Sequence, residues 1–518
     1  MNKHNAVQAI GNVDPMPIDL IAFQSTGRLL IIGDDKVINS VIPHLTGLDI
    51  SCVCDNAQLV AECETVTLME GSIQSIEGWL GDFTVRFVSK KLSFDLILDL
   101  SPQAILKRAV LPLGYFAPKE NSQALAEAIQ QLPNLKGQFD KPRYFNYQAS
   151  ICAHSRSQLS GCNQCLQACP AEAISSTGDT VTVNPYLCQG CGSCTAVCPS
   201  GAISYALPTL DVSLNRLRSM LQIWFEYDDS PPHLVIHDLA QGQVLAELMA
   251  DNLADNIILF AIEEIGALAI PFWLSALAYG ASAITVWDAG SHSDHDWAEL
   301  QQEVVYTNKL LTGLGYTDKV ISFFSTNEIA ALDRHISQHA CLSSMPVASF
   351  AGIDDKRQMI MMALQHLHQN APKNINILSL EEGAAFGEIK VDTDNCTLCH
   401  ACVSVCPVGA LLDGVDAPQL KFIEEQCVQC GLCETACPEK VIELRPRYLF
   451  DRQQARKPRL LHEEAVFHCI SCHKPFATKK MIDTMTEKLK DHAMFQGEAL
   501  NRLKMCEDCR VKAMFSNN

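Results

Sequence analysis

Cysteines recur along the chain at a spacing that suits iron–sulfur chemistry. In three segments, two residues separate the first cysteine from the second and the second from the third, three residues separate the third from the fourth, and a proline follows the fourth. The runs are Cys188, Cys191, Cys194 and Cys198 before Pro199; Cys396, Cys399, Cys402 and Cys406 before Pro407; and Cys427, Cys430, Cys433 and Cys437 before Pro438. In such runs three thiolates hold one 4Fe–4S cluster and the fourth binds a neighbouring cluster. The spacing therefore predicts cluster binding rather than zinc sites or structural cysteines.

A fourth run, in residues 152–170 (CAHSRSQLSGCNQCLQACP), departs from this spacing. The cysteines in register are Cys162, Cys165 and Cys169. Leu159 stands where the first cysteine is expected, and the nearest upstream cysteine is Cys152. The segment 153–161 is long enough to fold out and return, because the entropy cost of closing a loop grows slowly with its length. We expect Cys152 to supply the fourth ligand; His154, or an iron with an open position, are the alternatives.

The C-terminal segment carries two further cysteine pairs, each with two residues between its members. They are Cys469 with Cys472 and Cys506 with Cys509. Four thiolates in two pairs fit a closed tetrahedral zinc site, and the arrangement resembles a treble-clef zinc finger. The long spacer predicts a helix over MIDTMTEKLKDHA (481–493), and CEDCRVKAMF predicts the start of another. A single iron or a further cluster would use the same thiolates and remains the alternative, with His468 and His473 as bystanders.

Composition limits the classes of function. The chain has 24 cysteines, and its 39 Lys and Arg against 59 Asp and Glu give a formal net charge of −20. Residues 1–20 lack the apolar core of an export signal, so we expect a cytoplasmic protein. Disulfides are rare in that compartment, where dense cysteine indicates metal binding. The negative charge disfavours binding to nucleic acid and to anionic membrane surfaces.

One uncharged stretch, Ile265–Trp287, is long enough to cross a bilayer. Acidic residues flank it on both sides, and Pro271 divides it. Its second half, ASAITVW, has the character of a buried strand. We therefore expect a buried helix followed by a buried strand, and no membrane span.

The cysteine-rich segments alternate with regions in which apolar strands alternate with helices, which predicts parallel sheets. In the first region GRLLIIG (27–33), TVRFVS (84–89) and FDLILDL (94–100) are strand candidates. The acidic turn after Gly33 disfavours dinucleotide binding. The predicted fold is a multidomain protein of α/β and α+β class. Its expected parts are an α/β domain (1–140), a ferredoxin-type module (141–210), a second α/β domain (211–385), a second ferredoxin-type module (386–447) and a metal-binding module (448–518).

The two cysteine-rich modules each resemble a bacterial dicluster ferredoxin. That resemblance implies that the fourth cysteine of each run crosses to the neighbouring cluster, which gives four 4Fe–4S clusters in the chain. The implied ligand sets are Cys169, Cys188, Cys191 and Cys194; Cys152, Cys162, Cys165 and Cys198; Cys406, Cys427, Cys430 and Cys433; and Cys396, Cys399, Cys402 and Cys437.

The second α/β domain, through PFWLSALAYGASAITVWD (271–288), resembles the flavodoxin-like iron–sulfur subunits associated with hydrogenases and heterodisulfide reductases. In that family cysteines in this region bind a 2Fe–2S centre, but Phe272, Trp273 and Leu274 stand in their place here. We expect that centre to be absent and Trp273 and Tyr279 to belong to the hydrophobic core.

The order of the parts, with GQFDKPRYFNY (137–147) and CAHSRS (152–157), is similar to a family of proteobacterial cytoplasmic iron–sulfur proteins linked with formate dehydrogenases. The resemblance implies an electron-transfer protein or subunit whose partner is a formate-oxidising or related redox enzyme. Two other functions stay open: an oxidoreductase that uses flavin or NAD, and an accessory factor that assembles a partner metalloenzyme.

Overall fold

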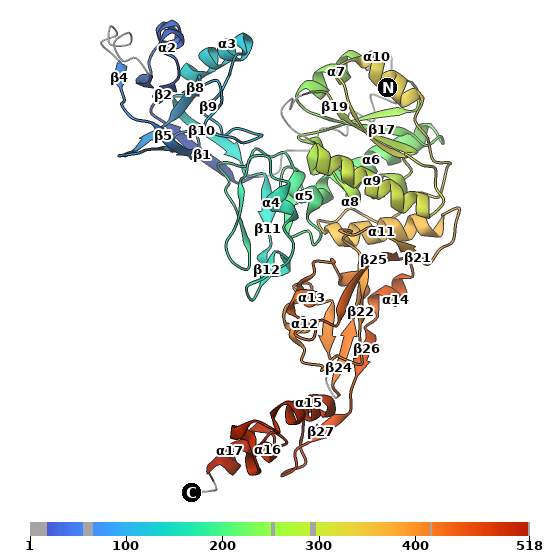
Figure 1. Ribbon diagram of the computed structural model, residues 1–518. Coiled ribbons are helices and arrows are strands. Elements are labelled where there is room, and N and C mark those ends of the chain that lie inside the picture. Colours follow the sequence, from blue (N-terminus) through green and yellow to red (C-terminus); the bar gives the residue numbers. More distant parts are fainter. Residues whose placement is uncertain (1–17, 55–65, 250–253, 291–296, 415–416, 516–518) are drawn as a thin grey trace.

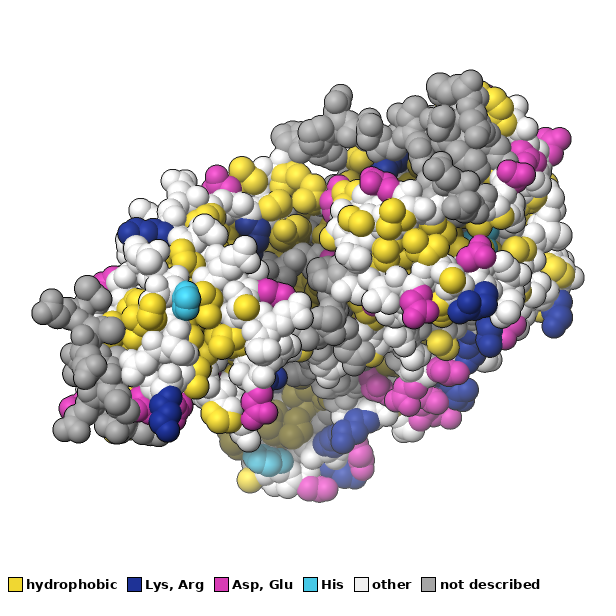
Figure 2. Space-filling view, turned by 90° about the horizontal axis from the view of Figure 1, so that it is seen from above, with side chains coloured by type: hydrophobic (Ala, Val, Ile, Leu, Met, Phe, Trp, Pro, Cys, Tyr) yellow, Lys and Arg dark blue, Asp and Glu magenta, His cyan; other side chains and the backbone are white. Residues whose placement is uncertain are grey.

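The computed structural model describes residues 18–54, 66–249, 254–290, 297–414 and 417–515. Figure 1 shows an elongated arrangement, with the two α/β domains at one end and the C-terminal module, in red, at the other. The first cysteine-rich module lies between the two α/β domains, and the second lies beyond helix α11 (Lys356–Gln369). Seen from above in Figure 2, acidic and basic side chains are interspersed over the two α/β lobes.

The N-terminal domain is built on a parallel sheet with the order β4-β3-β2-β8-β9. Its strands are β2 (Arg28–Ile32), β3 (Asp49–Val53), β4 (Val66–Leu68), β8 (Leu96–Asp99) and β9 (Tyr115–Phe116). Alternate side chains of β2 face opposite sides of the sheet. Leu29 and Ile31 pack with residues of α2 (Asp35–Val41) and α3 (Ser122–Gln131).

The other face of this sheet is covered by a small antiparallel sheet. It consists of β5 (Ile73–Glu77), β6 (Phe83–Phe87) and β7 (Lys91–Phe94). Leu30 and Ile32 of β2 pack against its aromatic side chains. The strand expected over TVRFVS therefore forms, as β6, but it does not join the parallel sheet. The two phenylalanines of β6, Phe83 and Phe87, are buried between the two sheets instead.

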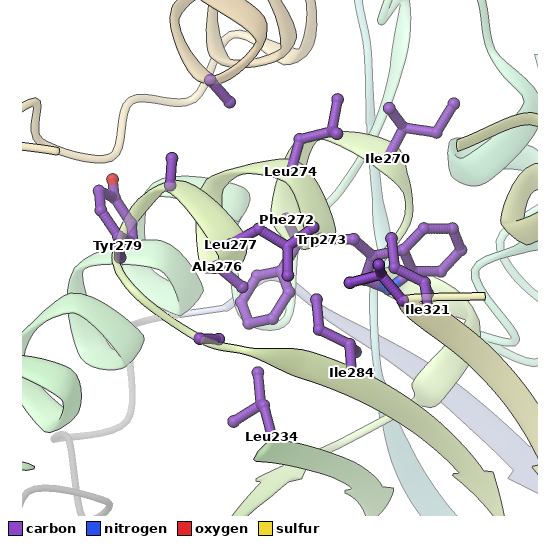
Figure 3. Packing of buried hydrophobic residues seen from close by; sticks show 14 of the residues in the cluster. Leu234, Ile270, Phe272, Trp273, Leu274, Ala276, Leu277, Tyr279, Ile284 and Ile321 are labelled. Carbon is purple, nitrogen blue, oxygen red and sulfur yellow. The ribbon is translucent and has the colours of Figure 1, made fainter. Parts of the chain in front are cut away.

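The second α/β domain holds a parallel sheet with the order β18-β17-β19-β20. The strands are β17 (His233–Asp238), β18 (Ile257–Ile262), β19 (Ala283–Asp288) and β20 (Ile321–Ser325). Helices α6 (Leu210–Tyr227), α8 (Ile270–Ala278), α9 (Ala298–Gly313) and α11 contribute to its core. Figure 3 shows α8 packed over this sheet, near Leu234 and Ile284. Every residue of α8 is buried.

The stretch Ile265–Trp287 thus contains the helix and the strand that its sequence predicts. Trp273 and Tyr279 are core residues, at 0% and 1% exposure. None of the helices in the described part of the chain is both long and apolar enough to span a membrane.

The first cysteine-rich module is made of short paired strands and two short helices. Its elements are β11 (Phe145–Tyr147) paired with β16 (Ile203–Tyr205), β14 (Ile174–Ser176) paired with β15 (Val181–Val183), α4 (Gln164–Gln167) and α5 (Ser193–Val197). The segment 153–161 folds out as a small hairpin of β12 (Ser155–Arg156) and β13 (Leu159–Ser160). Ser157 and Gln158 at its tip both have positive φ, at 54° and 65°, as in a type I′ turn.

The second cysteine-rich module repeats this plan. It comprises β22 (Gly387–Val391) paired with β25 (Ile442–Leu449), β23 (Leu411–Asp413) paired with β24 (Gln419–Phe422), α12 (Ala401–Ser404) and α13 (Leu432–Ala436). Strand β26 (Arg459–Glu463) extends its sheet. The C-terminal module follows, with β27 (Val466–His468), β28 (Pro475–Thr478), α15 (Lys479–Leu489), α16 (Glu498–Arg502) and α17 (Glu507–Phe515). Helices α15 and α17 lie where the sequence predicts them.

Candidate metal centres

The second cysteine-rich module contains two separate hollows, each lined by four cysteines. One is lined by Cys396, Cys399, Cys402 and Cys437, and the other by Cys406, Cys427, Cys430 and Cys433. Each hollow therefore takes three cysteines from one run and the last cysteine of the other run. Apolar side chains, among them Leu420 and Leu444, complete the two linings.

The cysteines of the first module fall into two groups of the same kind. Burial raises the pKa of Cys194, and the charges of Cys191, Cys188 and Cys169 raise it further. Burial likewise raises the pKa of Cys165 to about 12, together with the charges of Cys198, Cys162 and Cys152. The last cysteine of each run again lies with the three cysteines of the other run.

The hairpin 153–161 brings Cys152 back beside Cys162. At its base the amide N–H of Cys162 donates to the carbonyl oxygen of Ala153 at 2.8 Å. Both ring nitrogens of His154 are engaged elsewhere, Nδ1 with the carbonyl oxygen of Cys162 at 3.0 Å and Nε2 with the hydroxyl of Ser176 at 2.8 Å. The fold thus groups the Cys152 thiol with the other cysteines and gives His154 a supporting position. That Cys152 binds iron stays a prediction.

The turn of this hairpin is held from outside by Asp179. Its carboxylate accepts hydrogen bonds from the amides of Ser157 and Gln158 and from the hydroxyl of Ser155. These bonds hold the pKa of Asp179 below its usual value. A carboxylate that satisfies two turn amides fixes the tip of the hairpin.

The four groups suit 4Fe–4S clusters in their chemistry. Burial, and then the charges of neighbouring cysteines, raise the pKa of Cys402 and Cys430 to about 12, so thiolates here need a metal ion to compensate their charge. Main-chain amides also point at sulfur: Ala173 N lies 3.2 Å from Cys169 Sγ, Ala410 N lies 3.2 Å from Cys406 Sγ, and Val441 N lies 3.5 Å from Cys437 Sγ. Amide–sulfur bonds of this kind help to set the potential of a bound cluster.

The two modules meet where the hairpin of the first reaches helix α13 of the second. A Cβ atom on Gly161 would lie 2.8 Å from Cγ of Leu432. At this contact the charge of Cys162 adds to the causes that raise the pKa of Cys430. Sequence reasoning grouped the cysteines within each module but did not predict this approach between the modules.

The groups therefore follow one another in a row. Within the first module the charge of Cys165 acts on Cys194, and within the second the charge of Cys402 acts on Cys433. The order along the row is the Cys188 group (Cys169, Cys188, Cys191 and Cys194), the Cys162 group (Cys152, Cys162, Cys165 and Cys198), the Cys430 group (Cys406, Cys427, Cys430 and Cys433) and the Cys399 group (Cys396, Cys399, Cys402 and Cys437).

Sequence reasoning did not identify four basic residues that lie near these groups. Lys141, Lys356, Arg357 and Lys480 each donate to main-chain carbonyl oxygens close to cysteines. Lys356 and Arg357 begin helix α11, where the helix dipole disfavours cations. Two adjacent cations in the first turn of a helix are a signal that could have identified this pair.

The C-terminal cysteines form a separate cluster. The sulfur atoms of Cys469, Cys472, Cys506 and Cys509 all lie within 4.8 Å of one another. Cys469 and Cys506 are buried, Cys509 is half-buried and Cys472 is exposed. The four thiols thus come together as the spacing predicts.

The N-terminal domain holds three further cysteines, Cys52, Cys54 and Cys63. In the described part of the chain, Cys52 and Cys54 join no cluster of three or more metal-binding side chains. Cys52 is buried and Cys54 is half-buried on and beside β3, while Cys63 lies outside the described residues.

Comparison with protein families agrees with this geometry. Residues 160–202 match the model of a 4Fe-4S dicluster domain, and residues 389–412 and 420–443 match that of a 4Fe-4S binding domain. The chain thus contains two ferredoxin-type domains of the kind that carry 4Fe–4S clusters, and these point to a role in iron–sulfur electron transfer. The first match begins at Ser160, after Cys152 and most of the hairpin. No curated protein matches the chain.

Proposed function

We propose that the chain is an electron-transfer protein or subunit that holds four 4Fe–4S clusters and relays single electrons along one continuous route. The observation that carries the proposal is the contact between the modules, where strand β13, just before Cys162, packs against helix α13, which contains Cys433. A 4Fe–4S cluster accepts and donates one electron at a time. Two ferredoxin-type modules held in contact suit a relay better than two modules on flexible linkers.

The proposed ligands are the four groups of cysteines described above. Cys152, Cys162, Cys165 and Cys198 would hold one cluster, and Cys169, Cys188, Cys191 and Cys194 its neighbour in the first module. In the second module the two hollows would each hold one cluster. The grouping of Cys152 with Cys165, and the hydrogen bonds that occupy His154, support Cys152 as the ligand that replaces Leu159.

The proposed route ends near the surface at the Cys399 group, because Cys399 is an exposed cysteine. The partner at such an end is proposed to be a cytoplasmic redox enzyme. On the resemblance of the overall order of parts, that enzyme would be a formate dehydrogenase or a related complex. The C-terminal cysteines are proposed to hold one structural zinc, since a closed set of four thiolates suits that metal.

The decisive experiment is a metal and spin count on the full chain purified without oxygen. Four clusters and one zinc correspond to about sixteen iron atoms and about one zinc atom per chain. Full reduction should give four interacting spins per chain by electron paramagnetic resonance. Iron near eight atoms per chain, or clusters that cannot be reduced, would contradict the relay.

A second candidate function is a flavin- or NAD-dependent oxidoreductase. It is favoured by a cavity of about 330 Å³ between the first module and helices α9 and α11, whose walls include Cys198, Glu303 and Lys356. Glu299, Glu381 and Glu382 also line this cavity, and their charge disfavours a phosphate group. A flavin absorbance that copurifies with the chain would support this function, and its absence together with sixteen iron atoms would support the relay.

A further inference from the structure

Helix α11 starts between the two ferredoxin-type modules with two consecutive cations. The first, Lys356, extends toward the first module, where its Nζ donates to the carbonyl oxygens of Thr195 and Ala196 in helix α5. The nearest anionic groups that favour its charged form are Glu303 and then Cys198. The hydrogen bonds of the Lys356 ammonium group to the ferredoxin-type modules thus go to the first module and not to the second.

The second cation, Arg357, spans both modules. Its NH1 donates to the carbonyl oxygens of Pro199, at 3.3 Å, and Ala385, at 3.0 Å. Its NH2 donates to those of Glu425, at 3.0 Å, and Cys427, at 2.9 Å. Pro199 directly follows Cys198, so one guanidinium joins the main chain beside a cysteine of the first module to the main chain at a cysteine of the second.

This guanidinium is buried without a carboxylate partner among the described residues. All four of its hydrogen bonds go to carbonyl oxygens, and the ring of Phe386 lies 4.5 Å away. The nearby carboxylate of Glu425 is occupied by Arg452 and Arg456. A buried charge needs a counter-charge.

The cysteine groups are the nearest candidates for this counter-charge, because the guanidinium donates to the main chain at Cys427 and at Pro199, beside Cys198. Burial lowers the pKa of Arg357, and Cys427 is the first of the neighbouring groups that raise it. Arg357 also sits in the first turn of α11, where the helix dipole adds positive potential instead of relieving it. Positive charge beside a cluster stabilises its reduced form, which carries one more negative charge than the oxidised form.

We propose that Arg357 is the shared counter-cation of the two clusters at the junction between the modules, and that it raises both of their reduction potentials together. The inference rests on the proposed function. Each of these clusters would take one electron from a neighbour in the row, which is oxidised in the same event. Because the same cation acts on both clusters, their reduction potentials stay similar. An electron can then cross between the modules in either direction with little change in free energy.

The test is a potentiometric titration of the full chain, followed by electron paramagnetic resonance. In Arg357→Gln, two of the four clusters should become harder to reduce, with about a tenfold lower ratio of reduced to oxidised form at a fixed potential, which is about 59 mV for one electron. Arg357→Lys keeps the charge and should retain most of the wild-type potentials. The matched control is Arg334→Gln, at an exposed position of α10 (Ile329–Ser337).

The two shifted signals are identified by their change in Cys162→Ser and Cys430→Ser. Lys356→Gln provides an independent test. It should lower the reduction potentials of clusters in the first module and leave the potential of the cluster at the Cys430 group unchanged. If Arg357→Gln fails to load its clusters, the same comparison is made with Arg357→Lys, in which both junction signals should keep their potentials while Lys356→Gln shifts one module only.

Two results would overturn the inference: four loaded clusters whose potentials do not change in Arg357→Gln, or a shift in only one of the two junction signals. A wild-type iron content near eight would instead contradict the proposed function. The metal count thus separates the failure of one from the failure of the other.

Discussion

The thiol of Cys162 in the first ferredoxin-type module lies close enough to Cys430 in the second for its charge to raise the pKa of that thiol. The approach depends on Gly161, which presses its main chain against Leu432 of helix α13. Two groups of cysteines far apart in the sequence thereby become neighbours.

Enlarging the residue at this contact should separate the modules. In Gly161→Ala the new Cβ would meet the carbonyl oxygen of Ala153 at 2.5 Å and Leu432 at 2.8 Å. Overpacking of this kind costs about 1–3 kcal/mol of folding free energy. We expect weaker magnetic interaction between clusters of the two modules. Ser175→Thr, which adds one methyl group at an exposed position of β14 in the same module, is the control and should leave the spectra unchanged.

The displaced cysteine is tested by Cys152→Ser. One cluster signal should change and three should persist, because only the Cys162 group would lose a thiolate. His154→Gln should leave all four signals in place, since His154 bonds to Ser176 and to a carbonyl oxygen instead of facing the group. Cys341→Ser, at an exposed cysteine outside the runs, controls for loss of a thiol as such. Four unchanged spectra in Cys152→Ser would contradict Cys152 as a ligand.

The reduction potential of the cluster proposed at the Cys162 group should depend on pH near neutrality. Burial raises the pKa of Glu303 to about 7, so this side chain gains its negative charge as the pH rises through that value. Added negative charge beside Lys356 disfavours the reduced form, and the potential should fall between about pH 6 and pH 8. In Glu303→Gln the dependence should flatten, whereas Glu299→Gln in the same cavity should retain it. An equal slope in the wild type and in Glu303→Gln would refute the prediction.

The same titration has a consequence for stability. Glu303 has a folded pKa above that of the unfolded chain, where a glutamate titrates near 4.3. Its protonated form therefore favours folding, and this contribution is lost as the pH rises from about 4.3 toward 7.

The metal of the C-terminal module is decided by Cys506→Ser. If the four thiolates hold zinc, this variant loses about one zinc per chain and keeps about sixteen iron atoms. Loss of one iron atom would indicate mononuclear iron, and loss of four would indicate a further cluster. Helices α15 and α17 should also become less ordered, which circular dichroism can follow, because the metal would tie the two cysteine pairs together.

The sequence was most informative where the chemistry is local. The spacing of the runs predicted which cysteines share a module, and the length of the segment 153–161 predicted a loop that returns Cys152 to the others. The uncharged stretch through Trp273 predicted a buried helix and strand, since both must hide apolar side chains. In each case the structural feature is determined by residues that lie close together in the sequence.

The sequence was less informative where distant surfaces meet. TVRFVS has the composition of a strand, but nothing in it specifies an antiparallel partner. Nothing in the sequence around Gly161 indicates its contact with Leu432. The two adjacent cations at the start of α11 mark Lys356 and Arg357 as unusual, but the burial of Arg357 depends on how two modules and a helix dock together. Such contacts depend on the shapes of complete surfaces.

The bridge made by Arg357 also ties the stability of one module to that of the other. Its guanidinium joins carbonyl oxygens beside Cys198 and at Cys427, and Cys427 is only 8% exposed in the finished fold. A change that displaces the start of α11 would therefore loosen both modules at once, because a single side chain holds main chain in each of them.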